Sequence, residues 1–344
     1  MRMAAGWIGV VSLVLAGAGM VQAAERREPV LDRDAVNAAA FEAGDKPSRS
    51  SKRPDPLLVK AQVLLDRARF SPGAIDGRDG ENLRGSLKAF AQARGLKAGG
   101  QLDGRIWEAL AATSADQALT AYTVTEADLR GPFVEEIPDK MEEQADLKAL
   151  AYTSPAEMLA ERFHMSRALF DALNPDKDLK AGSVVTVAGV EPMGTDRPSA
   201  KDLPDEPKVA RIVVDKEALQ VRGYAEDGAL LRVYPASIGS EEKPAPTGRF
   251  KVKAVAFNPD YTYNPKYGFA GVKADRAFTI HAGPNNPVGL VWIDLSADSY
   301  GIHGTPEPEK IGKTESHGCV RLTNWDARDL ARHVAKGATV EFGE

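Results

Sequence analysis

The residue types best suited to chemistry are concentrated near the carboxyl end of the chain, between Gly301 and Leu322. This stretch contains His303, His317 and Cys319, and Cys319 is the only cysteine among 344 residues. A cysteine attacks as the thiolate, and its ordinary pKa of about 8.5 leaves few anions at neutral pH, so a neighbouring base must assist. The two histidines are the nearby candidates. The pattern therefore indicates nucleophilic catalysis by Cys319.

The neighbours of Cys319 add groups that acyl transfer uses. Gly318 lets the backbone approach a substrate closely, so the N–H groups around it can stabilise the oxyanion of a tetrahedral intermediate. Arg321 can form two parallel hydrogen bonds with a substrate carboxylate. His317 has an equally good explanation as a structural hydrogen-bonding residue. We therefore expect His303 to be the base.

Zinc binding is the alternative for the same side chains, because histidine and cysteine are zinc ligands. His303, His317 and Cys319 can supply three ligands. Structural zinc sites hold four ligands and favour a wider spacing than the two positions that separate His317 from Cys319. The pattern favours a nucleophile, and we expect no cofactor and no metal.

The amino end predicts export. Arg2 precedes an uncharged apolar stretch that ends in Val21-Gln22-Ala23, which is typical of a signal peptide over residues 1–23. An uncleaved anchor is the alternative, because the stretch approaches the ~20 residues that span a bilayer. Exported proteins normally keep cysteines paired. The single cysteine is therefore inert, intermolecular or reactive.

Length and composition predict several modules. The chain exceeds the roughly 100–200 residues of one domain, and its 43% hydrophobic and 27% charged content is typical of globular proteins. The net charge of -5 mixes both signs without a dense basic run, so we expect no nucleic-acid partner. The polar segment 24–54 predicts a flexible linker. Residues 191–208, which hold four prolines, predict a Pro-rich linker.

Three folded segments remain. Apolar residues at helical spacing predict a three-helix domain over 55–113. Residues 121–190 predict two short helices, in AEMLAERFHMSRALFDALNP, and a closing strand, in GSVVTVAGV. We interpret His164 as a packed residue within that helical stretch and His333 as a surface residue. Residues 209–344 are rich in β-branched runs and predict a mostly-β domain with one helix from Asn324 to Val334.

At this point the sequence resembles a known family. HGT followed by SHGCVRL is similar to the catalytic domain of YkuD-type L,D-transpeptidases, from about Ala210 to Phe342. The resemblance implies a mostly-β YkuD-type β-sandwich with a short helix. It implies that Cys319 is the acylated nucleophile and His303 the general acid/base. It also implies that the backbone at His317 and Gly318 supports the oxyanion. Substrate binding is implied for Arg321, Gly304 and Ser316.

The resemblance also implies a reaction and a compartment. Cys319 would attack after the diamino acid at position three of a peptidoglycan tetrapeptide stem, release D-alanine, and pass the acyl group to an amine. That cycle suits a His303 pKa near neutrality and needs no cofactor. The acceptor is the side-chain amine of another stem, giving a 3-3 cross-link, or a lysine of an outer-membrane lipoprotein. Similarity to enzymes of Gram-negative bacteria implies the periplasm. An L,D-carboxypeptidase and a non-catalytic wall-binding scaffold are the alternatives.

The two preceding modules resemble wall-binding units. Residues 55–113 are similar to the small peptidoglycan-binding domain, with a departure at Ala91, where that family usually has Gln. Residues 121–190 resemble a degenerate LysM module, a fold that binds N-acetylglucosamine chains. We therefore expect stem peptides and glycan strands as partners, and modules that target the enzyme without contributing to its active site.

Overall fold

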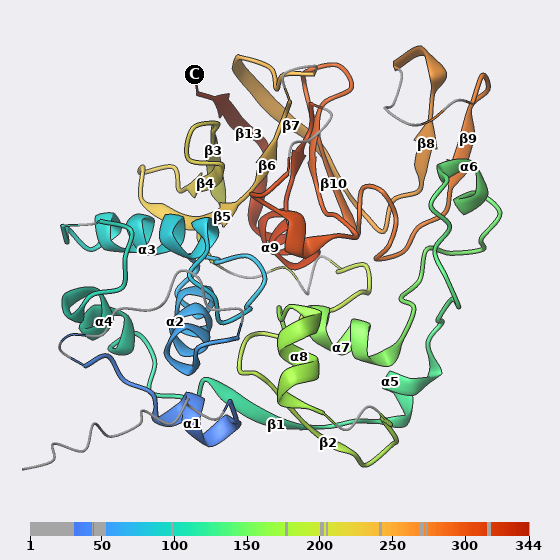
Figure 1. Cartoon of the computed structure of the whole chain (residues 1–344). Coiled ribbons are helices and arrows are strands. Elements are labelled where there is room, and N and C mark those ends of the chain that lie inside the picture. The colour runs from blue at the N-terminus through green and yellow to red at the C-terminus, as the bar shows by residue number, and fades with distance from the viewer. Residues whose placement is uncertain are drawn as a thin grey trace, which may run out of the picture.

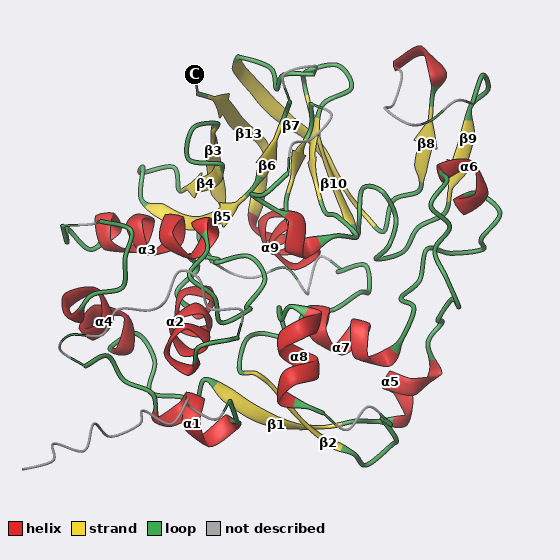
Figure 2. Cartoon of the chain, in the orientation of Figure 1, coloured by secondary structure: helices red, strands yellow, loops and turns green. Residues whose placement is uncertain are grey.

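The protein is represented by a computed structural model, which describes residues 31–42, 44, 53–97, 99–175, 178–199, 203, 206–240, 243–267, 272, 274–314 and 318–343. The predicted signal peptide, Ser316 and His317 lie outside the described residues. The strand-rich carboxyl-terminal half lies against a helical amino-terminal half (Figures 1 and 2). Within the described ranges, every helix is too short or too polar to cross a membrane.

The predicted three-helix domain is confirmed. It consists of α2 (Pro56–Arg67), α3 (Glu81–Ala93) and α4 (Gly104–Ala111). The side chains of Asp55 and Asp103 accept hydrogen bonds from the first free N–H groups of α2 and α4. The core includes Leu65, Leu87 and Phe90, and it also takes in Val233 from the carboxyl-terminal domain. The two parts of the chain therefore share a hydrophobic core.

The expectation of a flexible linker over 24–54 is wrong for its central residues. Helix α1 (Arg33–Ala38) buries Val36 completely. The Asn37 side chain donates to the carbonyl of Leu119 at 2.9 Å and accepts from its N–H at 2.8 Å, and Lys60 donates to two carbonyls at the end of the helix. The polar composition of residues 24–54 did not predict this helix, because a single buried valine and a few hydrogen bonds hold it in place.

Residues 119–190 form a strand–helix unit, named so hereafter. Its elements are β1 (Leu119–Thr123), α5 (Glu126–Arg130), α6 (Met141–Gln144), α7 (Pro155–Arg162), α8 (Arg167–Leu173) and β2 (Val184–Ala188). The two predicted helices and the closing strand are present, and β2 pairs antiparallel with β1. His164 lies between α7 and α8 with a φ of 58°, and not within a helix. It is packed, as expected: its Nδ1 lies 2.9 Å from Asp66, and its ring stacks on Trp325.

The carboxyl-terminal domain is mostly β, as predicted. Its nine-stranded sheet has the order β5-β4-β3-β13-β7-β10-β11-β12-β6, and β8 and β9 form a separate pair. The strands are β3 (Val209–Asp215), β4 (Gln220–Tyr224), β5 (Leu230–Pro235), β6 (Ser237–Ile238), β7 (Gly248–Phe257), β8 (Tyr261–Tyr263), β9 (Phe278–Ile280), β10 (Val291–Leu295), β11 (Gly301–His303), β12 (Val320–Arg321) and β13 (Val334–Phe342). Short 3-10 helices span Pro265–Tyr267 and Pro308–Lys310.

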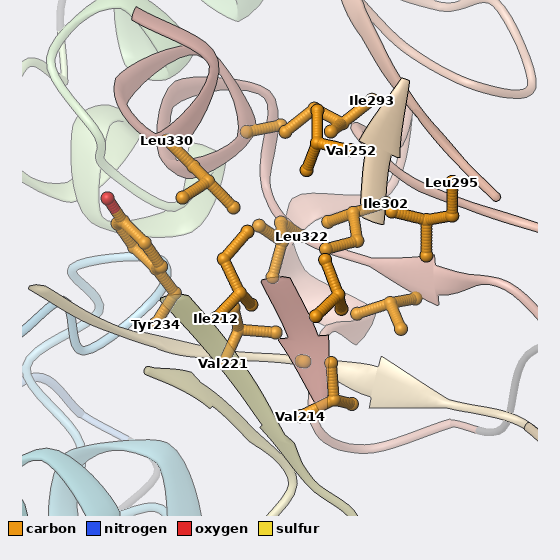
Figure 3. Packing of buried hydrophobic residues seen from close by; sticks show 14 of the residues in the cluster. Ile212, Val214, Val221, Tyr234, Val252, Ile293, Leu295, Ile302, Leu322 and Leu330 are labelled. Atoms are coloured by element: carbon orange, nitrogen blue, oxygen red, sulfur yellow. The ribbon is translucent and has the colours of Figure 1, made fainter. Parts of the chain in front are cut away.

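One hydrophobic core unites the ends of this sheet. Ile212 and Val221, from one end of the strand order, meet Ile293 and Ile302, from the other, and Leu330 packs on them from helix α9 (Asn324–His333) (Figure 3). Inward-facing residues alternate with outward-facing ones along each strand. The residues that each strand buries in this core therefore determine which of its side chains lie on the opposite face of the sheet.

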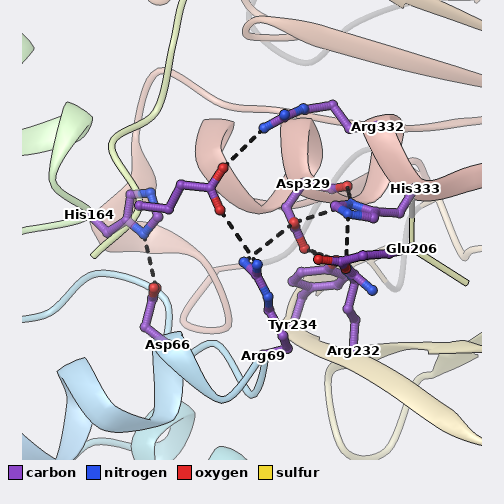
Figure 4. A network of polar contacts seen from close by, with 10 residues as sticks. Asp66, Arg69, His164, Glu206, Arg232, Tyr234, Asp329, Arg332 and His333 are labelled. Carbon is purple, nitrogen blue, oxygen red and sulfur yellow. Dashed lines mark hydrogen bonds and ion pairs between the residues drawn. The ribbon is translucent and has the colours of Figure 1, made fainter. Parts of the chain in front are cut away.

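The described residues of the segment 191–208 are held against the folded parts of the chain, because the carboxylates of Glu191 and Glu206 bind side chains on both halves of the molecule. Glu191 lies 3.5 Å from Arg69 and 3.3 Å from Arg332. Glu206 pairs with Arg232, which in turn pairs with Asp329 of α9 (Figure 4).

His333, expected at the surface, is 2% exposed, and its Nδ1 lies 2.7 Å from the carbonyl oxygen of Asp329. Helix α9 is covered on both sides, by the sheet and by the amino-terminal half. For this reason periodicity within the helix could not predict how deeply His333 is buried.

Candidate active site

Strands β11 and β12 bring the motif residues together. They pair in parallel, with Ile302 opposite Val320 and His303 opposite Arg321. Ile302 and Val320 lie in the hydrophobic core. Because strand side chains alternate between faces, His303, Arg321 and Cys319 all face the other way.

A cavity of about 550 Å³ opens on that outer face. Cys319, His303 and Arg321 all line it. Its other walls are formed by Lys243, Pro259, Asp260, Tyr261, Thr262, Tyr263, Asn264, Pro287, Val288, Trp292 and Ser299. Most of these come from β8 and the residues next to it and from the loop before β10, so the cavity lies between the nine-stranded sheet and the β8–β9 pair.

The imidazole of His303 is neutral. It is 5% exposed, and its Nδ1 lies 2.7 Å from the carbonyl oxygen of Gly304. A carbonyl oxygen only accepts, so Nδ1 carries the hydrogen and Nε2 keeps its lone pair. Burial, reinforced by the positive charge of Arg321, lowers the pKa of His303 to about 3. The expectation of a near-neutral pKa is wrong, because a sequence motif carries no information on burial.

Cys319 is held as a neutral thiol. Its Sγ lies 3.8 Å from the carbonyl oxygen of Ser299. Burial raises the pKa of the thiol above its ordinary 9.0, against the opposing effects of the Gly301 N–H and the Arg321 charge. A raised thiol pKa beside a lowered imidazole pKa disfavours a thiolate–imidazolium pair at rest.

Glycine is needed at two motif positions for different structural reasons. Gly318 has a φ of 102°, which favours glycine, and a Cβ there would lie 3.1 Å from the ring of Tyr300. Gly304 is buried behind the base, where a Cβ would overlap Asn324 Oδ1. The structure therefore places Gly304 against His303 and Asn324, in place of the substrate contact expected from the motif.

Arg321 completes the group of polar residues in the cavity. It forms no ion pair with any described residue. Burial lowers the pKa of its guanidinium, against the attraction of Cys319, Glu307 and Tyr261. Its five N–H donors are therefore open to a planar anion. In the described ranges no group of three His, Cys, Asp or Glu residues is arranged to bind a metal ion.

The sequence analysis missed several wall residues. Trp292 of β10 lies opposite His303, and the two rings stack with centroids 5.5 Å apart. The alternation in LVWIDLS could have placed Trp292 on the outer face of its strand. Tyr261, the first residue of β8, and Lys243, from the loop before β7, are distant from the motif in sequence, and no local pattern marks them.

The chain matches two family models. Residues 209–342 match the "L,D-transpeptidase catalytic domain", and residues 54–110 match the "Putative peptidoglycan binding domain". The chain is 31% identical over 144 residues to "Putative L,D-transpeptidase YqjB" of Bacillus subtilis, covering 40% of this chain and 72% of that protein. The chain belongs to the L,D-transpeptidase (YkuD) family.

Two further similarities were found. "Putative L,D-transpeptidase YkuD" of Bacillus licheniformis is 32% identical over 132 residues, covering 38% of this chain and 64% of that relative, so this chain spans less than two thirds of its length. The solved structure titled "Crystal structure of the L,D-transpeptidase (residues 123-326) from Xylanimonas cellulosilytica DSM 15894" is 14% identical, with a TM-score of 0.37, and the match covers 88% of this chain and 100% of that one.

Proposed function

We propose that this protein is an exported L,D-transpeptidase that acts on peptidoglycan tetrapeptide stems through a thioester on Cys319. The observation that supports this most directly is the parallel pairing of β11 with β12. It brings a thiol, an unprotonated imidazole nitrogen and a guanidinium into one cavity of about 550 Å³. These are the groups that cysteine-dependent acyl transfer needs.

The first half-reaction forms the thioester. Cys319 Sγ attacks the carbonyl carbon of the third stem residue, while His303 Nε2 accepts the thiol proton. The N–H groups next to Gly318 stabilise the oxyanion. When the C–N bond breaks, the His303 imidazolium returns the proton to the leaving amine, and D-alanine departs. Because the thiol and the imidazole are both neutral at rest, proton transfer accompanies attack and does not precede it.

The second half-reaction resolves the thioester. An acceptor amine attacks the thioester carbonyl, and His303 Nε2 takes one of its protons. The C–S bond then breaks, and the imidazolium protonates the departing sulfur, which restores the resting pair. Apolar walls such as Trp292 and Val288 reduce the access of competing water.

The surroundings of the active site support binding roles. Arg321 suits a stem carboxylate, because its fork of donors matches a planar anion. The peptidoglycan-binding unit supports attachment to the wall, and glycan binding by the strand–helix unit stays part of the proposal. We place the enzyme in the periplasm after removal of residues 1–23. The acceptor is a second stem or a lipoprotein lysine.

The test uses the mature chain, residues 24–344, with purified tetrapeptide muropeptides and mass spectrometry of the products. Cross-linked dimers with free D-alanine are expected. Trimmed tripeptides without dimers would identify an L,D-carboxypeptidase, and unchanged substrate would identify a scaffold. A carbapenem should acylate the protein once, and an adduct that persists in Cys319→Ala would contradict the assignment of the nucleophile.

The base is tested with a matched pair of histidine variants. His303→Gln should lower turnover by about 10²- to 10⁴-fold, the usual contribution of general acid–base catalysis. His281→Gln alters an exposed histidine outside the cavity, and we expect its turnover to match the unaltered enzyme. Equal losses in the two variants would refute the role given to His303.

A further inference from the structure

The strand–helix unit (residues 119–190) contacts the backbone that orients the base. The contact runs through Asn324, the first residue of α9, which is fully buried. Its Oδ1 accepts the N–H of Leu290 at 3.0 Å, and a Cβ on Gly304 would overlap that oxygen. The carbonyl of Gly304 in turn accepts the hydrogen of His303 Nδ1. The Asn324 side chain thus supports the peptide that sets the tautomer and ring orientation of the base.

Glu161 holds the other end of the Asn324 carboxamide. It lies in the last turn of α7 and is 5% exposed, and its Oε1 accepts from Asn324 Nδ2 at 2.6 Å. The carbonyl of Pro284 accepts from the same NH₂ group at 3.1 Å. Rotating the carboxamide by half a turn would turn its NH₂ toward the Leu290 N–H, donor against donor. Glu161, at the shortest of these contacts, therefore acts with Pro284 and Leu290 to hold the Asn324 oxygen toward Gly304.

A second set of contacts reaches the cavity wall. Asn285 donates from Nδ2 to the carbonyl of Ala151 and to Glu157 Oε1, both at 2.9 Å. The N–H of Asn285 is bonded to the carbonyl of Leu150 at 2.9 Å. Pro287 and Val288, which line the cavity, follow within three residues. The same unit therefore anchors both the support of the base and the loop that forms one wall.

We propose that Glu161 is a positioning residue for His303, acting through Asn324, and that the strand–helix unit is a working part of the active site as well as an appended module. This proposal rests on the function proposed above. Loss of the Oε1 acceptor frees the Asn324 carboxamide, which lets Gly304 and the base shift. A displacement of about 1 Å at a catalytic group is enough to lower turnover by up to about 10²-fold.

The experiment uses the full mature chain with three variants. Glu161→Met keeps side-chain length but removes the acceptor, and Glu161→Gln restores an acceptor oxygen at the same place. Ser71→Ala is the matched control, because Ser71 Oγ donates to Asp326 Oδ2 at 3.0 Å on the same helix, in a buried contact that does not lead to Gly304. Steady-state turnover of tetrapeptide stems and thermal unfolding are measured for each, and Glu161→Ala replaces Glu161→Met if that variant does not fold.

We expect kcat of Glu161→Met to fall about tenfold or more with KM within twofold, Glu161→Gln to recover kcat to within twofold, and Ser71→Ala to keep kcat. A kcat for Glu161→Met within twofold of the unaltered enzyme, or an equal loss of kcat in Ser71→Ala, would overturn the proposal.

Ring ¹⁵N spectra of His303 provide a readout that needs no substrate. Glu161→Met should lose the single Nδ1–H tautomer that the unaltered chain and Glu161→Gln retain, and an unchanged spectrum would also overturn the proposal. If the unaltered enzyme leaves tetrapeptides intact, the proposed function fails, and the spectra still decide the positioning role.

Discussion

The protonation state of the catalytic pair can be measured through alkylation of Cys319. Burial raises the pKa of its thiol above the ordinary 9.0 and lowers that of His303 to about 3, so the proton is held far more tightly by the sulfur than by the imidazole. The thiolate–imidazolium pair is therefore a minor species at rest.

The assay is the rate of iodoacetamide addition to Cys319 from pH 5 to pH 10.5, followed by intact-protein mass. The rate should rise about tenfold for each pH unit until the thiol ionises, so that at pH 7 it lies at least about 100-fold below its alkaline plateau. His303→Gln should leave this profile within about threefold of the original, because a neutral imidazole does not stabilise the thiolate. Carbapenem acylation, which needs a proton acceptor, should fall by about 10²- to 10⁴-fold in the same variant.

A different alkylation profile would contradict this prediction. A flat alkylation rate between pH 5 and pH 8 that disappears in His303→Gln would show a resting thiolate–imidazolium pair. The electrostatic reasoning from burial would then be refuted, and proton transfer would precede attack.

Three further predictions concern stability, each measured by chemical unfolding. Burial opposes the ionisation of Asp128, but hydrogen bonds from Thr125, Tyr122 and Arg162 outweigh it and lower its pKa from 3.8 to about 2. Its stabilising effect of about 2 kcal/mol is therefore complete above pH 4 and lost as pH falls through about 2, and Asp128→Asn should lack this acid dependence. Burial raises the pKa of Glu161 from 4.5 to about 8. The free energy of unfolding of the unaltered chain should therefore fall by about 1.4 kcal/mol per pH unit between those values, while Glu161→Gln should lack this dependence. The difference in unfolding free energy between the two proteins should change by about 3 kcal/mol from pH 5 to pH 7. Val36→Ala should lower the free energy of unfolding by about 2 kcal/mol, because α1 packs that side chain into a closed core. A loss near zero would show that residues 31–42 behave as a free linker.

The sequence alone predicted the family, a class of chemistry and much of the fold. HGT and SHGCVRL predict a thiol nucleophile at Cys319, its base at His303 and close backbone approach at Gly318, because cysteine-dependent acyl transfer needs these groups together. The matched family models and relatives confirm the family assignment. Hydrophobic periodicity predicted the helices around residues 55–113 and the strands after residue 209, since local spacing decides which face of an element is apolar.

Only the tertiary structure decided how the site is tuned and what supports it. The pKa of His303 depends on its burial and on Arg321, and the sequence motif contains neither. Asn324 meets Glu161 across 163 residues of chain, and Ser71 meets Asp326 across 255. Contacts at such separations arise only when several elements pack together, and their effect on charge and orientation follows from the solvent that packing removes. For this reason the sequence predicted separate modules in the amino-terminal half, whereas in the folded protein this half is packed against helix α9.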